Sequence, residues 1–547
     1  MPKITISLND FQKLNGKTTS IEKLKEILSM LKGDLESQHD DELTLSMNDT
    51  NLPHLWSVEG IARHSRGILG LETGLPKIEI QKSGYSVIVD PSVRAVRPCI
   101  ASFVAKGPAL TEQLLISLVQ LQEKLSEHYG RRRQKVSIGL YPAKAIEFPI
   151  TYKAVEPDRL SFIPLEGRTE TTLKDVVYNH PKGKTYGWIL ANAKKYPVLM
   201  DNRKNVLSLP PIINSEQTGR LTPGDTDLFF DATGMTQDAV NLVATIVAYA
   251  LYDRGYKIYP CIIRQGGKSI QCPNITPIKI KINEELISSM LGMPLSKTTI
   301  QDLLKKARCD AKLPLVQLPA YRQDIMHPVD IVEEAAIMYG FSNIIEQQLT
   351  SYTVGKPLQN KGFLNAARHA TALAGYVEVL SPVLSNKDIQ HDRMLTQVNS
   401  IELTNPVSAT YTTVRSGILP GLLELLGKNR HADYPQRAFE QGRIVTLENE
   451  KIHDTELLAA VTCHSKADIT DIRQLADNIL RPLGIQYTLL ETEHKTFIQG
   501  RAANIIVKGT SVGILGEIHP LVLSKFNIEQ PVAALEIDLT KLQNSSM

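Results

Sequence analysis

Cysteine and long apolar runs are what this sequence most clearly lacks. Its 547 residues include five cysteines, none in a C-x-x-C pair: Cys99, Cys261, Cys272, Cys309 and Cys463. This odd, scattered set argues against a disulfide framework or a cysteine-rich zinc site, and fits a reducing cytoplasm. No apolar run approaches the ~18 residues that a membrane span needs, and the polar start MPKITISLND is unlike a secretion leader. We therefore expect a soluble, cytoplasmic protein without membrane contact.

Local catalytic and nucleotide-binding motifs are also missing. The sequence has no H-E-x-x-H, G-x-S-x-G or G-x-G-x-x-G pattern, so a metalloprotease, an esterase or a dinucleotide-binding protein lacks its usual local signature. Three tripeptides resemble the end of a phosphate-binding loop: GKT at 16–18, GKT at 183–185 and GKS at 267–269. The glycine that such a loop needs five residues earlier is replaced by Phe11, Tyr178 and Ile262. Ordinary turns are the better interpretation.

Length and composition indicate a modular globular protein. A chain of this length exceeds what one hydrophobic core organises, and predicts about three or four domains. Apolar residues make up 42% and charged residues 22%, with 61 basic against 58 acidic side chains. This balance excludes a disordered chain and a wholly basic nucleic-acid coat, and it names no partner.

The hydrophobic patterns predict a multidomain fold that mixes α/β and α+β modules. Strand and helix patterns alternate through the first half of the chain, which favours a mixed sheet with covering helices. The last part has a long helix pattern at 360–376 and a final strand in AALEIDL, which favours an antiparallel sheet flanked by helices. The expected modules are a small mixed module at 1–82, an α/β module at 83–268, a small helical module at 269–348 and a sheet domain at 349–547.

The segment YRQDIMHPVDIVEE at 321–334 gathers four carboxylates: Asp324, Asp330, Glu333 and Glu334. His327 and Pro328 are typical of an N-cap and a first helical position, so we predict a helix that runs to about Tyr339 with Gly340 behind it. Three of the carboxylates then lie on one face in the first turns, where the helix dipole offsets part of their repulsion. The alternative is an oxygen-rich site for a hard cation.

Several phrases together make the chain resemble phenylalanyl-tRNA synthetase beta subunits of the archaeal and eukaryotic cytosolic type. They occur in the family's order and span nearly the whole chain: NDTNLPHLWSVEGIAR, SLPPIINSEQTG, FFDATG, LPAYRQDIMHPVDIVEEAAIMYGF, TNPVSATYTTVRSGILPGLL and GEIHPLVL. Two departures are visible, because His54 stands where the family usually has an aspartate, and Tyr141 and Pro142 replace a His-Asp pair.

The resemblance implies a noncatalytic subunit of phenylalanine-tRNA ligase. Phenylalanine and ATP would bind to a separate alpha subunit, and two alpha and two beta chains would form a tetramer that charges tRNA(Phe). The last module would be a class II synthetase-like fold without the ATP signature, with GYVEVLSPVL (375–384) at a subunit interface. Arg415 and the phrase FEQG (439–442) would mimic the second class II motif, or else Arg415 pairs with Glu440 inside the scaffold.

The resemblance also implies an editing site at 83–268 that hydrolyses tyrosine wrongly attached to tRNA(Phe). The expected catalytic residues are Ser208, Asn214, Asp231 and Thr233, with Leu199, Ser215 and Glu216 as substrate-binding residues. Short polar side chains can bind a tyrosyl hydroxyl and orient water. The alternative for these residues is a Pro-fixed loop and an Asx-type turn, which favour the same residue types.

Two further sets of residues complete the expectations. In the resembled family the four carboxylates Asp324, Asp330, Glu333 and Glu334 bind Mg²⁺ at the border with the alpha chain. The run GRRRQK offers Arg131, Arg132, Arg133 and Lys135 as RNA contacts, although a solvated helix end is the commoner explanation for so short a run. A free-standing editing hydrolase and a structural RNA-binding scaffold remain alternative functions.

Overall fold

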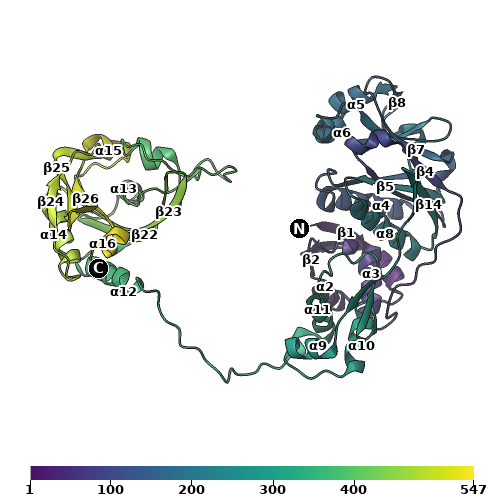
Figure 1. Ribbon diagram of the computed structural model, residues 1–547, viewed down its shortest axis with the longest axis horizontal. Helices are drawn as coiled ribbons and strands as arrows, with labels where there is room; N and C mark the ends of the chain where they lie inside the picture. The colour runs from purple at the N-terminus through teal and green to yellow at the C-terminus, as the bar shows by residue number, and fades with distance from the viewer. Residues whose placement is uncertain (1, 547) are drawn as a thin grey trace. The chain divides into compact units, whose positions relative to one another are not determined.

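The computed structural model describes residues 2–546 and divides the chain into two compact units, residues 1–347 and 348–547 (Figure 1). Each unit has hydrophobic clusters of its own. No helix in the described part of the chain is long and apolar enough to cross a membrane.

Unit 1 begins with a three-stranded antiparallel sheet and three helices. The sheet has the order β1-β3-β2, with β1 at Lys3–Ser7, β2 at Gly33–His39 and β3 at Glu42–Met47. The helices are α1 (Leu8–Asn15), α2 (Ile21–Met30) and α3 (Val58–Ile68). Helix α2 ends at Met30, and Gly33 already begins β2. The chain makes that turn through Lys32, whose φ is 56°.

A ten-stranded mixed sheet forms the centre of unit 1. Its main path is β12-β11-β10-β7-β4-β14-β5-β13-β6, and β15 pairs with β14. Only β4 is parallel to its neighbours, β7 and β14. The strands are β4 (Ser86–Val89), β5 (Cys99–Lys106), β6 (Val136–Pro142), β7 (Ile150–Val155), β10 (Tyr196–Met200), β11 (Val206–Leu209), β12 (Ile213–Asn214), β13 (Asp227–Gly234), β14 (Lys257–Gln265) and β15 (Lys268–Cys272).

Helices cover the side of this sheet that faces the N-terminal module (Figure 1). They are α4 (Glu112–Lys124) and the apolar α8 (Gln237–Asp253), which packs on β5 and β13. A small excursion between β7 and β10 contains β8 (Ser161–Phe162), β9 (Thr171–Thr172), α5 (Leu173–Asn179) and α6 (Pro181–Tyr186). The predicted alternation of strands and helices over a mixed sheet is therefore present.

The end of unit 1 is less purely helical than the sequence indicated. Beside α9 (Glu284–Leu291), α10 (Lys297–Lys306) and α11 (Pro328–Tyr339), it contains an antiparallel sheet of β16 (Ile278–Lys281), β17 (Asp310–Lys312) and β18 (Leu315–Leu318). The hairpin β17-β18 escaped prediction because strands this short carry little periodicity. Helix α11 is confirmed as predicted, with His327 as N-cap and Gly340 directly after its last residue.

Unit 2 is built on a seven-stranded sheet with the order β19-β22-β23-β27-β26-β25-β24. All neighbours are antiparallel except β19 and β22. The strands are β19 (Val377–Glu378), β22 (Gln436–Glu448), β23 (Lys451–Cys463), β24 (Thr488–Glu491), β25 (Phe497–Val507), β26 (Thr510–Ile518) and β27 (Val532–Asp538). The flanking helices are α12 (Lys361–Leu373), α13 (Leu419–Lys428), α14 (Ile469–Leu480), α15 (Pro520–Lys525) and α16 (Leu539–Ser546).

Candidate functional site: a pocket at the seam of the central sheet

The two ends of the ten-stranded sheet are joined by side chains. The Tyr141 hydroxyl on β6 lies 2.9 Å from the Ser208 hydroxyl on β11. The Asn214 amide on β12 donates to the carbonyl oxygen of Leu140 on β6 at 3.4 Å. The sheet therefore curls until its end strands β6 and β12 approach each other. We call this junction the seam.

Arg133 is a further connection across the seam. Its guanidinium donates to the carbonyl oxygens of Pro211 at 3.2 Å and Ile212 at 3.0 Å, which lie between β11 and β12. The same guanidinium stacks over the Tyr186 ring at 4.1 Å. Arg133 therefore connects the two ends of the sheet, and that it also contacts RNA stays a prediction.

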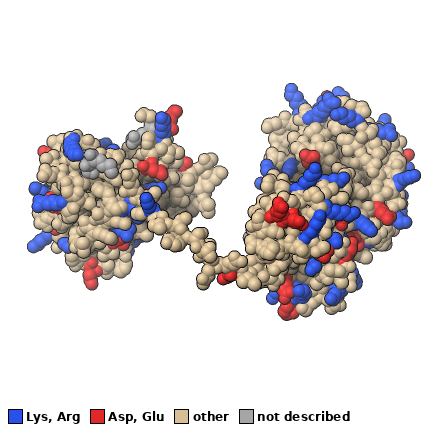
Figure 2. Space-filling view, turned by 60° about the horizontal axis from the view of Figure 1, so that its bottom comes forward, with Lys and Arg blue, Asp and Glu red and all other residues tan. Residues whose placement is uncertain are grey.

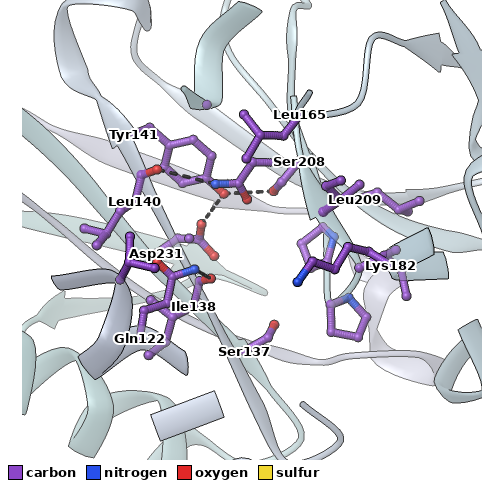
Figure 3. A pocket seen from close by; sticks show the side chains of 18 of the residues that line it. Gln122, Ser137, Ile138, Leu140, Tyr141, Leu165, Lys182, Ser208, Leu209 and Asp231 are labelled. Carbon is purple, nitrogen blue, oxygen red and sulfur yellow. Dashed lines mark hydrogen bonds between the residues drawn. The ribbon is translucent and has the colours of Figure 1, made fainter. Parts of the chain in front are cut away.

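A pocket of about 410 Å³ opens at the seam. Its polar end is formed by Tyr141, Ser208 and Asp231, which point toward one another in Figure 3. Its walls are mainly apolar, and include Ile138, Leu140, Leu165, Leu209 and Ile213. Charged or titratable side chains also line it: Glu123, Arg133, Glu166, His180, Lys182 and Arg220. We call this cavity the seam pocket.

The structure brings three of the seven predicted editing residues together in the seam pocket: Ser208, Asn214 and Asp231. The other four do not line it. Leu199 is buried in the core of the sheet, and Ser215 is buried at the start of α7 (Glu216–Gly219). Glu216 binds Arg220 at 2.5 Å. Thr233 is buried and accepts a hydrogen bond from Arg97 at 2.9 Å.

Asp231 is a buried carboxyl group with an unusual environment. It lies on β13 opposite Gly139 of β6, is 2% exposed, and accepts a hydrogen bond from the Tyr141 hydroxyl at 2.6 Å. A Cβ atom at Gly139 would collide with both the Tyr141 hydroxyl and an Asp231 oxygen, so only glycine leaves room for this contact. Among residues 2–546, no cation forms a salt bridge with Asp231.

Burial sets the electrostatics of Asp231. Removal of water from the carboxylate raises the pKa of Asp231 to about 7, while the hydrogen bond from Tyr141 and the charge of Arg97 act in the opposite direction. Arg97 is itself fully buried and donates to Thr233 and Ser137, and burial lowers its pKa to about 10. A carboxyl group with a pKa near neutrality can take up and release a proton at physiological pH.

Sequence reasoning missed several of these residues. Arg97, Gly139 and Lys182 belong to no local motif, so nothing in the sequence marks them. Tyr141 differs, because it stands out as a departure from the resembled family. Its hydroxyl shows why the position matters, since it contacts both Asp231 and Ser208.

The basic run at 131–135 is a tight turn against the end of a π-helical segment (η3, Leu125–Tyr129). Arg131, Arg132 and Arg133 have φ angles of 50°, 53° and 65°, and their N–H groups donate to carbonyls at the end of that segment. The Lys135 ammonium packs on the Tyr129 ring at 3.9 Å, and burial lowers its pKa. Arg131 and Arg132 are exposed, with Arg132 placed 6.0 Å from the Trp188 ring. Charges of both signs are interspersed on the face shown in Figure 2.

The four carboxylates of the acidic segment have separate partners. Asp324 and Glu334 each bind the buried Arg322 guanidinium at 2.6 Å. Asp330 accepts hydrogen bonds from the backbone N–H groups of Met326 at 2.7 Å and His327 at 2.8 Å, which completes the N-cap of α11. Glu333 binds Lys32 at 2.9 Å.

This arrangement does not fit magnesium held by the four carboxylates. Magnesium requires several oxygen ligands around one point, and the described residues contain no group of three or more His, Cys, Asp or Glu side chains that could hold a metal ion. The charge of Asp324 and Glu334 is offset by a buried arginine. Magnesium binding would require Arg322 to release both carboxylates.

Unit 2 resolves the two interpretations of Arg415. The Arg415 guanidinium and the Glu440 carboxylate lie 2.5 Å apart, and both side chains are buried. Arg415 also donates to the Ser381 hydroxyl at 3.0 Å. The residue therefore holds the scaffold together, as the second interpretation predicted.

Comparisons with known proteins agree with these features. Residues 280–341 match the family model "tRNA synthetase B5 domain", and residues 344–539 match "Phenylalanyl tRNA synthetase beta chain CLM domain". The fold and these matches define a chain of an aminoacyl-tRNA synthetase. The phenylalanine–tRNA ligase beta subunit of Pyrococcus horikoshii is 36% identical over 99% of this chain and 100% of its own length, and that of Archaeoglobus fulgidus is 35% identical over 99% and 98%. The chain belongs to the family of phenylalanine–tRNA ligase beta subunits.

A solved structure supports the fold of unit 1. The crystal structure of an N-terminal fragment of the phenylalanyl-tRNA synthetase beta subunit from Pyrococcus horikoshii superimposes with a TM-score of 0.61 at 36% identity. It covers 62% of this chain and 100% of the fragment.

Proposed function

We propose that the chain serves as the beta subunit of phenylalanine–tRNA ligase and supports the ATP-dependent attachment of phenylalanine to tRNA(Phe) by an alpha subunit. Its full-length similarity to beta subunits is the observation that carries this proposal. Phenylalanine and ATP bind to the alpha subunit, because the sequence of the beta chain has no nucleotide-binding motif.

An exposed apolar strip in unit 2 supports contact with the alpha subunit. Val377 on the end strand β19 is 66% exposed, and Leu380 is 85% exposed. Leu373, Val383 and Leu384 are exposed nearby in the sequence. Large apolar side chains left exposed within one short segment indicate a surface that a partner covers. We propose that the alpha chain covers this strip in a tetramer of two alpha and two beta chains.

Pyrophosphate exchange tests this division of labour. The purified chain alone should neither form an aminoacyl-adenylate nor charge tRNA, and addition of the alpha subunit should restore both activities. Leu380→Glu should weaken assembly in sedimentation experiments, whereas Leu490→Glu, on the similarly exposed β24, should leave it intact. Adenylate formation by the isolated chain would contradict the proposal.

The seam pocket is the proposed editing site for tyrosyl-tRNA. Its volume and apolar walls suit an aromatic side chain, and its polar end offers hydrogen-bond partners for a hydroxyl group. In the proposed reaction, Asp231 accepts a proton from water as the water oxygen bonds to the ester carbonyl carbon. The bond to the ribose oxygen then breaks, and that oxygen takes up a proton. The proton that Asp231 took from water goes to this oxygen, so the products are free tyrosine and uncharged tRNA(Phe), and the step uses no ATP.

Deacylation of preformed tyrosyl-tRNA tests the editing proposal. Asp231→Ala removes the base and should slow deacylation by roughly 100-fold or more. Asn214→Ala should also slow it, while phenylalanine charging stays near normal because synthesis occurs in the alpha subunit. Glu216→Gln is the matched control, since Glu216 lies outside the pocket lining. If both pocket variants deacylated tyrosyl-tRNA at the wild-type rate, Asp231 and Asn214 would not belong to the editing site.

The tRNA end would approach the pocket over exposed cations and an aromatic side chain. Lys182 reaches toward the pocket in Figure 3, and Trp188 in the turn η5 (Gly187–Leu190) is 47% exposed beside Arg132. Aromatic rings and arginines bind unpaired bases by stacking. Trp188→Ala should raise the KM for tyrosyl-tRNA about 10-fold with little change in kcat; an unchanged KM would exclude this path.

A further inference from the structure

Tyr141 joins three strands of the central sheet that are distant in sequence. It lies on β6, the end strand of the sheet path, and its hydroxyl reaches Ser208 on β11 at 2.9 Å and Asp231 on β13 at 2.6 Å. The side chain is 1% exposed, so water does not compete for these contacts. Gly139, one pleat earlier on the same strand, leaves the space that the contact with Asp231 needs.

The direction of this hydrogen-bond chain follows from the number of protons. A tyrosine hydroxyl has one proton, and an ionised carboxylate can only accept. When Asp231 is ionised, the Tyr141 proton therefore goes to Asp231, and the Ser208 hydroxyl donates to the Tyr141 oxygen. The shorter distance to Asp231 agrees with this order, because hydrogen bonds to charged groups are shorter and stronger.

We propose that Tyr141 is a positioning residue of the editing reaction, whose hydroxyl holds the Asp231 carboxylate at the polar end of the seam pocket and ties it across the seam to Ser208. This inference rests on the proposed editing function. Tyr141 does not itself take the proton from water in this scheme. It acts through Asp231, so its loss changes the protonation of Asp231 as well as its position.

Among the side chains around Asp231, Tyr141 lowers its pKa most strongly. Burial raises the pKa of Asp231, and the hydrogen bond from Tyr141 and the charge of Arg97 lower it. Tyr152 on β7 is a buried neighbour whose hydroxyl donates to the carbonyl of Arg97 at 2.8 Å. The remaining titratable or charged side chains of the pocket lining are Glu123, Arg133, Glu166, His180, Lys182 and Arg220. None of these forms a direct contact with Asp231 in the described part of the chain.

This arrangement fixes the direction in which loss of the Tyr141 hydroxyl shifts the titration midpoint of Asp231. Tyr141→Phe removes a donor that stabilises the ionised form, so the titration midpoint of Asp231 should rise by about one to two pH units. Specific ¹³C labelling of aspartate in the full chain reads this midpoint by NMR, with Asp231→Asn to assign the signal. Tyr152→Phe is the matched control, because it removes another buried tyrosine hydroxyl of the same sheet and should leave the midpoint unchanged.

Deacylation of tyrosyl-tRNA as a function of pH gives the second readout. In Tyr141→Phe the acidic limb of the pH profile should move up by the same interval, so the rate falls about 10-fold near pH 7 and recovers above pH 9. A purely structural defect would lower the rate equally at every pH. Ser208→Ala keeps the contact between Tyr141 and Asp231, and should give a smaller upward shift of the midpoint.

The two proposals fail in different ways. If the wild-type chain does not deacylate tyrosyl-tRNA, the editing function is wrong, and the NMR midpoint still measures whether Tyr141 controls Asp231. If the wild type is active but the Asp231 midpoint in Tyr141→Phe is unchanged or lower, the role of Tyr141 is overturned. Should Tyr141→Phe not fold, an unchanged midpoint in Ser208→Ala overturns it equally.

Discussion

Unit 1 contains two clusters of carboxyl groups that are largely shielded from water. They differ in whether a cation offsets the negative charge. At the acidic segment, Asp324 and Glu334 share the buried Arg322, and each carboxylate lies 2.6 Å from its guanidinium. At the seam pocket, no cation of residues 2–546 forms an ion pair with Asp231, and its hydrogen bond comes from the neutral Tyr141. One cluster is neutralised internally, and the other leaves a carboxyl group facing a cavity.

This difference separates a structural cluster from a candidate site. A carboxylate that is paired with a buried guanidinium has its charge and lone pairs already satisfied. A carboxyl group that is buried without a cation keeps a pKa near the working pH, which favours proton transfer. The acidic segment holds more carboxylates and is the more conspicuous pattern in the sequence. The single carboxyl group of Asp231 is nevertheless better suited to transfer a proton near neutral pH.

The largest expected effect is on the paired cluster. Arg322→Met removes the buried cation between Asp324 and Glu334 and leaves two partly buried carboxylates without it. We expect a loss of about 3–5 kcal/mol in the unfolding free energy of unit 1. Fluorescence reports on this unit alone, because the two tryptophans of the chain, Trp56 and Trp188, both lie in it. A loss below about 1 kcal/mol would mean that the cluster is held some other way.

Replacement of the unpaired Asp231 carboxyl group should raise the stability of the chain at neutral pH instead of lowering it. Burial raises the pKa of Asp231 to about 7 in the folded chain, against ~3.9 in an unfolded chain. Ionised Asp231 therefore costs stability increasingly as the pH rises from about 4 to 7. Asp231→Asn should be more stable than wild type at pH 8 by about 2–4 kcal/mol, and the difference should vanish near pH 4. Asp324→Asn, by contrast, should destabilise unit 1. If both variants changed the unfolding free energy in the same direction, the contrast between the two clusters would be wrong.

The smallest effect should come from the exposed end of the acidic segment. Lys32 binds Glu333 at 2.9 Å and Asp49 at 3.0 Å, but all three side chains are partly exposed. Lys32→Met should cost no more than about 1 kcal/mol, and most of that cost should disappear in high salt. Denaturation of this variant with and without 1 M salt measures the effect. A larger, salt-insensitive loss would place Glu333 in the structural cluster as well.

Local chemistry in the sequence determined the elements. Helix α11 begins after His327 and ends before Gly340 as predicted, because an N-cap, a proline at the first position and a glycine after the last turn act over a few residues. The final strand in AALEIDL was likewise readable from its composition. The hairpin β17-β18 was not, because its strands are too short to show a pattern.

Only the tertiary structure decided what the polar residues do. Ser208, Asn214 and Thr233 are short polar residues with the same predicted role. In the folded sheet the first two line the pocket, whereas Thr233 is bound to Arg97. Tyr141 meets Ser208 and Asp231 across 67 and 90 residues of chain. The same is true of the carboxylates, since Lys32 reaches Glu333 from 301 residues away. Local patterns fix backbone geometry through nearby contacts, whereas ion pairs and pKa values depend on which distant groups are buried together.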